Sequence, residues 1–228
     1  MHPKICLPMR RTRRIALGTG VAVAISLLAA WMPVQAAHAD LPSPGGRGPK
    51  PSSPLHGLTM EPAPVVGGLS LPDAAAGGAD FPLVAPRRGL LLVFFGYTSC
   101  PDICPTTLSD LGAALRKLGP KRAQRVHVAM VTVDPTRDTP EVLTGYLAHF
   151  LRSRYSALRT DDPVALRTVA DAFGARYEVT TTPTGKTEVG HSALVYAVDH
   201  SGRVVLAWPF GVSTRALTAD LATLLRRA

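Results

Sequence analysis

The apolar residues of this chain recur in two patterns that alternate from residue 90 to the C-terminus. Mainly apolar runs at 90–95 and 125–133 are typical of strands buried on both faces of a sheet. After the first run, Leu108, Leu111 and Leu115 follow a spacing of three and four residues, which predicts an amphipathic helix over 103–118. Buried strands that alternate with amphipathic helices indicate a layered α/β domain.

Capping signals mark the starts of two further helices. Thr139 and Asp162 each precede a proline, and a capping side chain followed by proline is typical of a helix N-terminus. The leucines of the C-terminal segment predict a last helix that begins at about residue 213.

Two apolar runs near the C-terminus predict a β-hairpin. Residues 192–198 and 203–208 flank the short glycine-containing segment 199–202, which reads as a tight turn. The order strand, helix, strand, helix, helix, hairpin and helix predicts a thioredoxin-like fold with one additional helix before the hairpin. We therefore expect an α/β fold, a central mixed sheet flanked by helices, in a single domain over 65–228.

The N-terminal region differs from this domain in composition. Residues 1–39 combine five basic and no acidic residues with an apolar stretch at 15–31 and an Ala-His-Ala sequence at 37–39. This pattern predicts an export signal peptide, with Arg13-Arg14 leaving both general and twin-arginine export open. An N-terminal membrane anchor is the alternative, because the apolar stretch approaches the ~20 residues of a membrane span. Residues 40–64, rich in Pro, Gly and Ser, predict a flexible linker.

Part of the strong positive charge belongs to this leader. The whole chain has 25 Lys and Arg against 16 Asp and Glu, a net charge of +9. Without residues 1–39, 20 basic residues face 16 acidic residues, a net charge of +4. No basic cluster interleaved with aromatic residues follows in the sequence, so we expect no nucleic-acid partner.

Both cysteines beyond the leader lie where the first predicted strand meets its helix. Cys100 and Cys104 occur in the sequence Cys-Pro-Asp-Ile-Cys, and their spacing at a helix start places both sulfurs on one face. The positive end of the helix dipole favours a thiolate, which is the form that a metal ligand or nucleophile needs. A disulfide between them closes too small a loop to add much stability. The pair therefore predicts thiol redox chemistry or metal binding.

Three segments at the ends of predicted strands carry recognisable motifs: Phe95-Gly-Tyr-Thr-Ser-Cys-Pro-Asp-Ile-Cys-Pro105, Val133-Asp-Pro-Thr-Arg-Asp-Thr-Pro140 and Gly190-His-Ser-Ala193. These motifs resemble the SCO/SenC family, thioredoxin-fold copper chaperones linked to assembly of the copper centre of cytochrome c oxidase. The resemblance covers about residues 65–226. It implies that Cys100, Cys104 and His191 are the metal ligands.

The donor types agree with this implication. Two thiolates and one imidazole suit Cu(I) and also accommodate Cu(II), whereas hard ions such as Mg²⁺ or Ca²⁺ are poorly served. Zinc stays open, although a structural zinc site usually has four protein ligands. From position alone, the remaining histidines of the linker and domain are more typical of surface or packing residues: His56, His127, His149 and His200.

Two functions follow from the resemblance. The first is an exported copper chaperone, in the periplasm or at the outer face of the cytoplasmic membrane, that delivers copper to the copper-site subunit of cytochrome c oxidase. Membrane proximity is expected, and another copper donor protein or a thiol reductase is a further candidate partner. The alternative is a thiol-disulfide oxidoreductase, with Cys100 and Cys104 as the redox-active pair, that reduces the cysteines of the oxidase copper site. His191 discriminates between the two, because a reductase does not need it.

The sequence departs from the family pattern beside two of these motifs. Gly190 occupies a position where the family usually has aspartate, and Ser99 one where it commonly has histidine. A glycine next to the expected ligand predicts a less tightly positioned His191 and a weaker preference for Cu(II). The resemblance implies that Arg137 and Asp138 lie near the loop of the two cysteines and help to recognise a partner. From the residues alone we favour a capped turn that starts the helix at Pro140.

Overall fold

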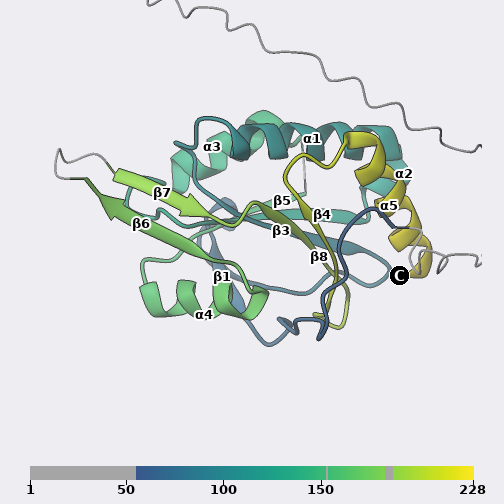
Figure 1. The fold of residues 1–228 in the computed structure, drawn as a ribbon, viewed down its shortest axis with the longest axis horizontal. Coiled ribbons are helices and arrows are strands. Elements are labelled where there is room, and N and C mark those ends of the chain that lie inside the picture. Colours follow the sequence, from purple (N-terminus) through teal and green to yellow (C-terminus); the bar gives the residue numbers. More distant parts are fainter. Residues whose placement is uncertain (1–54, 153, 183–186) are drawn as a thin grey trace, which may run out of the picture. The chain divides into compact units, whose positions relative to one another are not determined.

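The computed structural model describes residues 55–152, 154–182 and 187–228 (Figure 1). The predicted leader and residues 40–54 of the predicted linker lie outside the described residues. Among the residues that are described, no helix has the length and apolar character needed to cross a membrane.

A seven-stranded mixed sheet, ordered β2-β1-β5-β4-β3-β8-β9, forms the centre of the domain. Its three inner strands β3, β4 and β5 are parallel, and β8 runs antiparallel to β3. The strands are β1 Ser70–Asp73, β2 Ala79–Pro82, β3 Leu90–Gly96, β4 Val126–Thr132, β5 Tyr155–Leu158, β8 Leu194–Val198 and β9 Val204–Pro209. All seven residues of β3 are buried, as its continuous apolar run predicts.

Helices lie on both sides of this sheet. They are α1 Ile103–Leu118, α2 Pro120–Ala123, α3 Pro140–Phe150, α4 Pro163–Phe173, α5 Thr214–Arg227 and the 3-10 helix η1 Ala74–Ala76. Figure 1 shows α1, α3 and α5 on one side and α4 on the other. The side chains of Thr139 and Asp162 accept hydrogen bonds from the backbone N–H groups of Val142 and Val164, which confirms both predicted caps.

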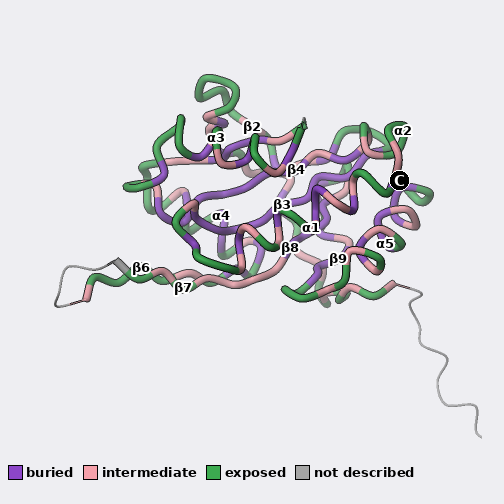
Figure 2. Tube along the Cα trace, turned by 90° about the horizontal axis from the view of Figure 1, so that it is seen from above, coloured by how far each residue is buried: buried purple, intermediate pink, exposed green. Residues whose placement is uncertain are grey.

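A second sheet and three short strands of the main sheet are absent from the sequence prediction. The second sheet pairs β6 Tyr177–Thr181 with β7 Thr187–His191 as an antiparallel ribbon. Its residues are mostly exposed or half-buried (Figure 2), so no apolar run marks them. The other unpredicted strands, β1, β2 and β5, have only four residues each, too few for a clear alternation.

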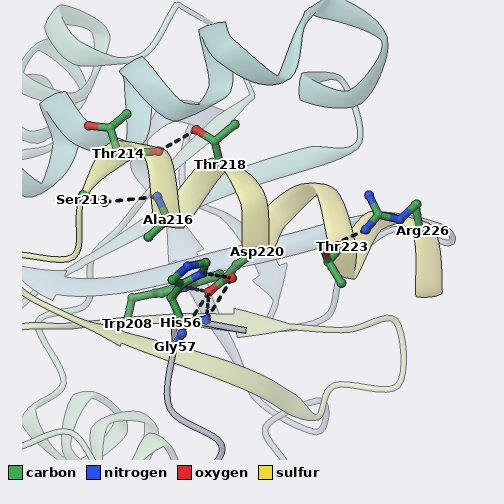
Figure 3. Close-up of polar contacts among 10 residues, drawn as sticks. All are labelled: His56, Gly57, Trp208, Ser213, Thr214, Ala216, Thr218, Asp220, Thr223 and Arg226. Carbon is green, nitrogen blue, oxygen red and sulfur yellow. Dashed lines mark hydrogen bonds and ion pairs between the residues drawn. The ribbon is translucent and has the colours of Figure 1, made fainter. Parts of the chain in front are cut away.

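Packing of the described chain starts earlier than the composition suggests. The sequence places the start of the domain at residue 65, but Leu58 already pairs with Ala207 in β9 through two backbone hydrogen bonds. The backbone N–H groups of His56 and Gly57 donate to the buried carboxylate of Asp220 in α5 (Figure 3). Residues 56–58 therefore differ from a flexible linker, because a buried acceptor and a strand edge bind their backbone groups.

Candidate metal centre

The two cysteines follow the carboxyl end of the central strand β3. Cys104 lies in the first turn of α1 and is fully buried, whereas Cys100 lies in the loop before the helix and is 9% exposed. The backbone N–H of Cys104 donates to Sγ of Cys100 over 3.4 Å. Both sulfurs thus lie at one end of the helix, as the four-residue spacing predicts.

A glycine allows the sulfur of Cys104 to lie against the end of the strand. A Cβ atom built on Gly96 would be 2.9 Å from Sγ of Cys104 and 2.7 Å from the ring of Phe94. Both distances are well below ordinary van der Waals contact, so a larger residue would displace the thiol. The Phe-Gly-Tyr-Thr sequence therefore has a steric role beside the cysteines.

His191 reaches the same place from the other side of the site. It ends β7, directly before the segment 192–198 that the sequence predicts as a strand, and its Nε2 lies 3.4 Å from Sγ of Cys104. The ligating atoms of Cys100, Cys104 and His191 all lie within 4.8 Å of one another. Because metal bonds to sulfur and nitrogen are about 2.0–2.3 Å long, one ion can contact all three donors after small side-chain rotations.

The imidazole of His191 is held in the form that a metal ligand requires. Its Nδ1 lies 3.1 Å from the backbone oxygen of Ser192, which fixes the proton on Nδ1 and leaves the lone pair of Nε2 toward Cys104. Burial lowers the pKa of His191, and the Ser192 carbonyl offsets this only in part. The rings of Phe94 and Tyr97 pack edge-on against the imidazole, with centroids 6.1 and 5.8 Å away.

Gly190 lies beside this histidine, but residues other than its neighbour at 190 hold the imidazole ring in place. The residue is exposed and pairs with Glu178, and a Cβ atom there would meet nothing within 4 Å. Successive residues of a strand point to opposite faces, so a side chain at position 190 would point away from the face of His191. Ser192, Phe94 and Tyr97 position the imidazole instead.

Burial decides the protonation of Cys104 in the absence of a metal. Desolvation raises the pKa of its thiol well above the ordinary value, against a smaller opposing effect of a backbone hydrogen bond. Burial thus opposes the thiolate that the helix N-terminus is expected to favour. A bound cation would supply the missing positive charge, and its binding would release the proton.

Asp138 is the residue whose role the sequence left open. Its fully buried carboxylate accepts hydrogen bonds from the backbone N–H and hydroxyl of Thr98 and from the hydroxyl of Thr132. Thr98 belongs to the loop that carries Cys100, and Thr132 ends β4. Asp138 therefore links the loop that carries Cys100 to the neighbouring strand β4. The capped turn that the sequence also allowed would not by itself make this link.

Arg137 extends this support toward the surface. It forms an ion pair with Asp134, and its guanidinium lies 5.8 Å from the centroid of the Tyr97 ring. The Tyr97 hydroxyl lies 3.5 Å from the backbone oxygen of Val189 in β7. Arg137 and Tyr97 thus connect the loop after β4 to the ribbon that carries His191.

The other histidines lie outside this site. His127 contacts the hydroxyl of Ser156 and stacks on Phe81, while His56 contacts Asp220. His149 packs against Phe150 in α3, and His200 is exposed in the turn between β8 and β9. Throughout the described part of the chain, no second group of three His, Cys, Asp or Glu side chains lies close enough to share an ion.

Comparison with known proteins identifies the family. The model of the family described as SCO1/SenC matches residues 85–226, more than half of the chain. This chain belongs to the SCO1/SenC family. An SCO2-like protein of Rickettsia prowazekii is 32% identical over 133 residues, which are 58% of this chain and 63% of that protein. The chain spans only 53–64% of the length of its bacterial curated relatives.

Solved structures of SCO1/SenC proteins share the fold. The apo Sco1 protein from Thermus thermophilus is 33% identical with a TM-score of 0.65, and the match covers 77% of this chain and 99% of that one. Bradyrhizobium japonicum ScoI, solved with copper bound, is 32% identical with a TM-score of 0.59 over 68% of this chain and 96% of that one. The predicted thioredoxin-like fold is confirmed by these matches.

Asp138→Asn should weaken metal binding without removing a ligand. Asparagine keeps one acceptor oxygen, but its amide nitrogen cannot accept, so the hydroxyl of either Thr98 or Thr132 loses its acceptor. The Cys100 loop therefore loses part of its anchor. Loss of such an outer partner costs roughly 10–100-fold in metal affinity. A Cu(I) competition titration against a chelator measures the change.

Asp162→Asn is the matched control for this substitution. Asp162 also precedes a helix, but it is exposed and only caps α4, and asparagine caps helices about as well. We expect wild-type affinity for the control. Equal affinities for both variants would mean that Asp138 does not position the loop.

Proposed function

We propose that this protein is an exported copper chaperone that binds one copper ion through Cys100, Cys104 and His191 and passes it to the copper-site subunit of cytochrome c oxidase. The observation that carries the proposal is the convergence of two sulfurs and one imidazole nitrogen within 4.8 Å. Two soft donors and one borderline donor match Cu(I), with Cu(II) as a second state.

Family membership supports both the metal and the acceptor. Bradyrhizobium japonicum ScoI has been solved with copper bound, and Sco proteins are described as cytochrome c oxidase assembly proteins. In this chain, residues 1–39 would direct export to the periplasm or the outer membrane face, and the part of 40–64 before Leu55 would link the domain to the membrane region. Such a placement brings the site near a membrane-bound acceptor.

The exposure of the three ligands suits release as well as binding. Cys104 is fully buried, whereas Cys100 is 9% exposed and His191 is half-buried. A ligand of the acceptor would therefore reach the ion from the side of Cys100 and His191. Exchange of ligands one at a time would then move copper without exposing it to water.

One observation favours the alternative, a thiol-disulfide oxidoreductase. The N–H of Cys104 donates to the sulfur of Cys100, so the two cysteines lie close together, as exchange between dithiol and disulfide requires. Against it, burial raises the pKa of the Cys104 thiol, and the orientation of His191 has no part in this chemistry. Copper binding is therefore the function that the geometry supports best.

His191→Ala separates the two functions. We expect the variant to keep Cu(I), which two cysteine sulfurs can hold, and to lose tight Cu(II) binding together with its thiolate-to-copper absorption. Titration with Cu(I) and Cu(II), followed by ultraviolet-visible spectroscopy, measures both. Cycling of the cysteine pair between dithiol and disulfide should change little.

His200→Ala is the control, because His200 lies in an exposed turn outside the candidate metal centre. It should bind both copper states like the wild type. Loss of Cu(II) in His200→Ala but not in His191→Ala would contradict the ligand set. A metal-free wild-type protein that readily cycles its disulfide would instead favour the reductase.

A further inference from the structure

The end of the domain opposite the candidate metal centre carries an unusual concentration of positive charge. Segments 86–89, 116–125 and 225–228, with Arg152 and Arg154, contain 11 Lys and Arg and no Asp or Glu. The remainder of residues 65–228 has seven basic and 14 acidic residues. We call these five pieces of chain the basic end.

The pieces of the basic end are neighbours in space. They precede β3, β4 and β5 or end α1 and α5, and in Figures 1 and 2 α2 and the end of α5 lie together, away from the β6–β7 ribbon. Arg125 donates to the backbone oxygens of Arg88 and Leu225, which joins three of the pieces.

The charge of the basic end is not neutralised within the described part of the chain. The ion pairs among the described residues join His56 to Asp220, Arg137 to Asp134 and Arg159 to Asp161. None of them includes a residue of the basic end. Asp199 lies in the turn after β8, and its carboxylate is occupied by Ser201 and the backbone of Arg203.

An apolar cavity opens between these basic side chains. Its volume is about 450 Å³, within the usual size of a small-molecule pocket. Apolar side chains from α1, α3 and the start of β4 line it, among them Leu115, Phe150 and Val126. The exposed residues Arg116 and Arg152 line the same cavity. Positive charge beside an apolar hollow matches an amphiphile with an anionic head.

We propose that the basic end docks on an anionic phospholipid bilayer, with lipid phosphates on its arginines and lysines and the apolar part of one lipid in the cavity. A nucleic acid would use the charge but not the cavity. The Cys104 and Arg116 positions are 12 residues apart in α1, or about 18 Å. Docking through the basic end would therefore leave the metal centre facing away from the lipid surface. This proposal does not depend on which metal is bound.

Vesicle binding of the full chain tests the proposal. Vesicles of neutral phosphatidylcholine are compared with vesicles that also contain phosphatidylglycerol, at low and high salt. Each basic side chain near an anionic surface contributes roughly fivefold to partitioning. Arg116→Gln/Arg152→Gln should therefore lower the partitioning that depends on phosphatidylglycerol about 25-fold. Amide hydrogen exchange of vesicle-bound protein should show protection in 116–125.

A double variant of equal charge is the control. Arg176→Gln/Arg215→Gln removes two exposed arginines outside the basic end and should bind vesicles like the wild type. An equal loss in both double variants would overturn the proposal, since only net charge would then matter. Binding through the basic residues of 1–39, which every variant retains, would leave 116–125 unprotected and would also overturn it. So would tighter binding to duplex DNA than to the anionic vesicles.

Discussion

Cys104→Ala is expected to abolish tight copper binding in both oxidation states. The substitution removes the donor that lies deepest in the site and leaves one thiolate and one imidazole, which cannot satisfy a trigonal copper centre. Loss of an outer partner alone costs roughly 10–100-fold in affinity, so loss of a ligand should cost more. Copper bound after competition with a Cu(I) chelator measures the result, with a stoichiometry near zero expected.

The control for Cys104→Ala is a test that the variant is still folded. Cys104 is fully buried and its sulfur lies near Gly96 and Phe94, so alanine leaves a small cavity. Circular dichroism and the thermal midpoint should show a folded protein of slightly lower stability. A folded variant that still binds one copper tightly would exclude Cys104 from the ligand set.

Most of the central fold could be predicted because strong local patterns specify it. The buried strands β3 and β4 have apolar runs, and α3 and α4 begin at a capping side chain followed by proline. The ribbon β6–β7 could not be predicted, since both of its strands are largely solvent-exposed and no apolar alternation marks them. The two strands pair through backbone hydrogen bonds, and the pattern of side chains along the sequence does not indicate such pairing.

The three candidate ligands could be named from the sequence, but the residues that support them could not. Cysteine spacing and the family resemblance point to Cys100, Cys104 and His191, and the structure brings their ligating atoms together. The roles of Asp138 and Ser192 depend on which backbone groups the fold brings near them. The pKa of the Cys104 thiol likewise depends on its burial, which the local sequence does not reveal.

Asp220→Ala should strongly lower the stability of this domain. Its buried carboxylate accepts hydrogen bonds from the backbone N–H groups of His56 and Gly57, from Nδ1 of His56 and from the indole of Trp208 (Figure 3). Alanine leaves the buried indole N–H without an acceptor and frees residues 55–58. We expect a loss of about 3 kcal/mol in the free energy of unfolding, or a thermal midpoint lower by about 6–12 °C.

The ionisation of the same carboxylate should make the stability of the domain depend on pH. Burial alone would raise the pKa of Asp220, but the hydrogen bonds from His56, Trp208 and Gly57 outweigh it and hold the pKa below its ordinary value. A depressed pKa means that the stabilisation is complete above the unfolded pKa of about 3.9 and is lost as pH falls through the folded value. The difference between wild type and Asp220→Ala should therefore be largest near neutral pH and shrink in acid.

Trp208→Phe isolates the indole hydrogen bond within this network. The phenyl ring keeps much of the buried apolar surface but donates nothing, so the carboxylate retains its partners at His56 and Gly57. Because Asp220 and Trp208 interact directly, their combined variant should lose less stability than the two single losses added together. Urea unfolding of the four proteins at several pH values measures both effects. Strictly additive losses would mean that the indole and the carboxylate are not coupled. No dependence on acid pH would mean that the ionised carboxylate does not stabilise the fold.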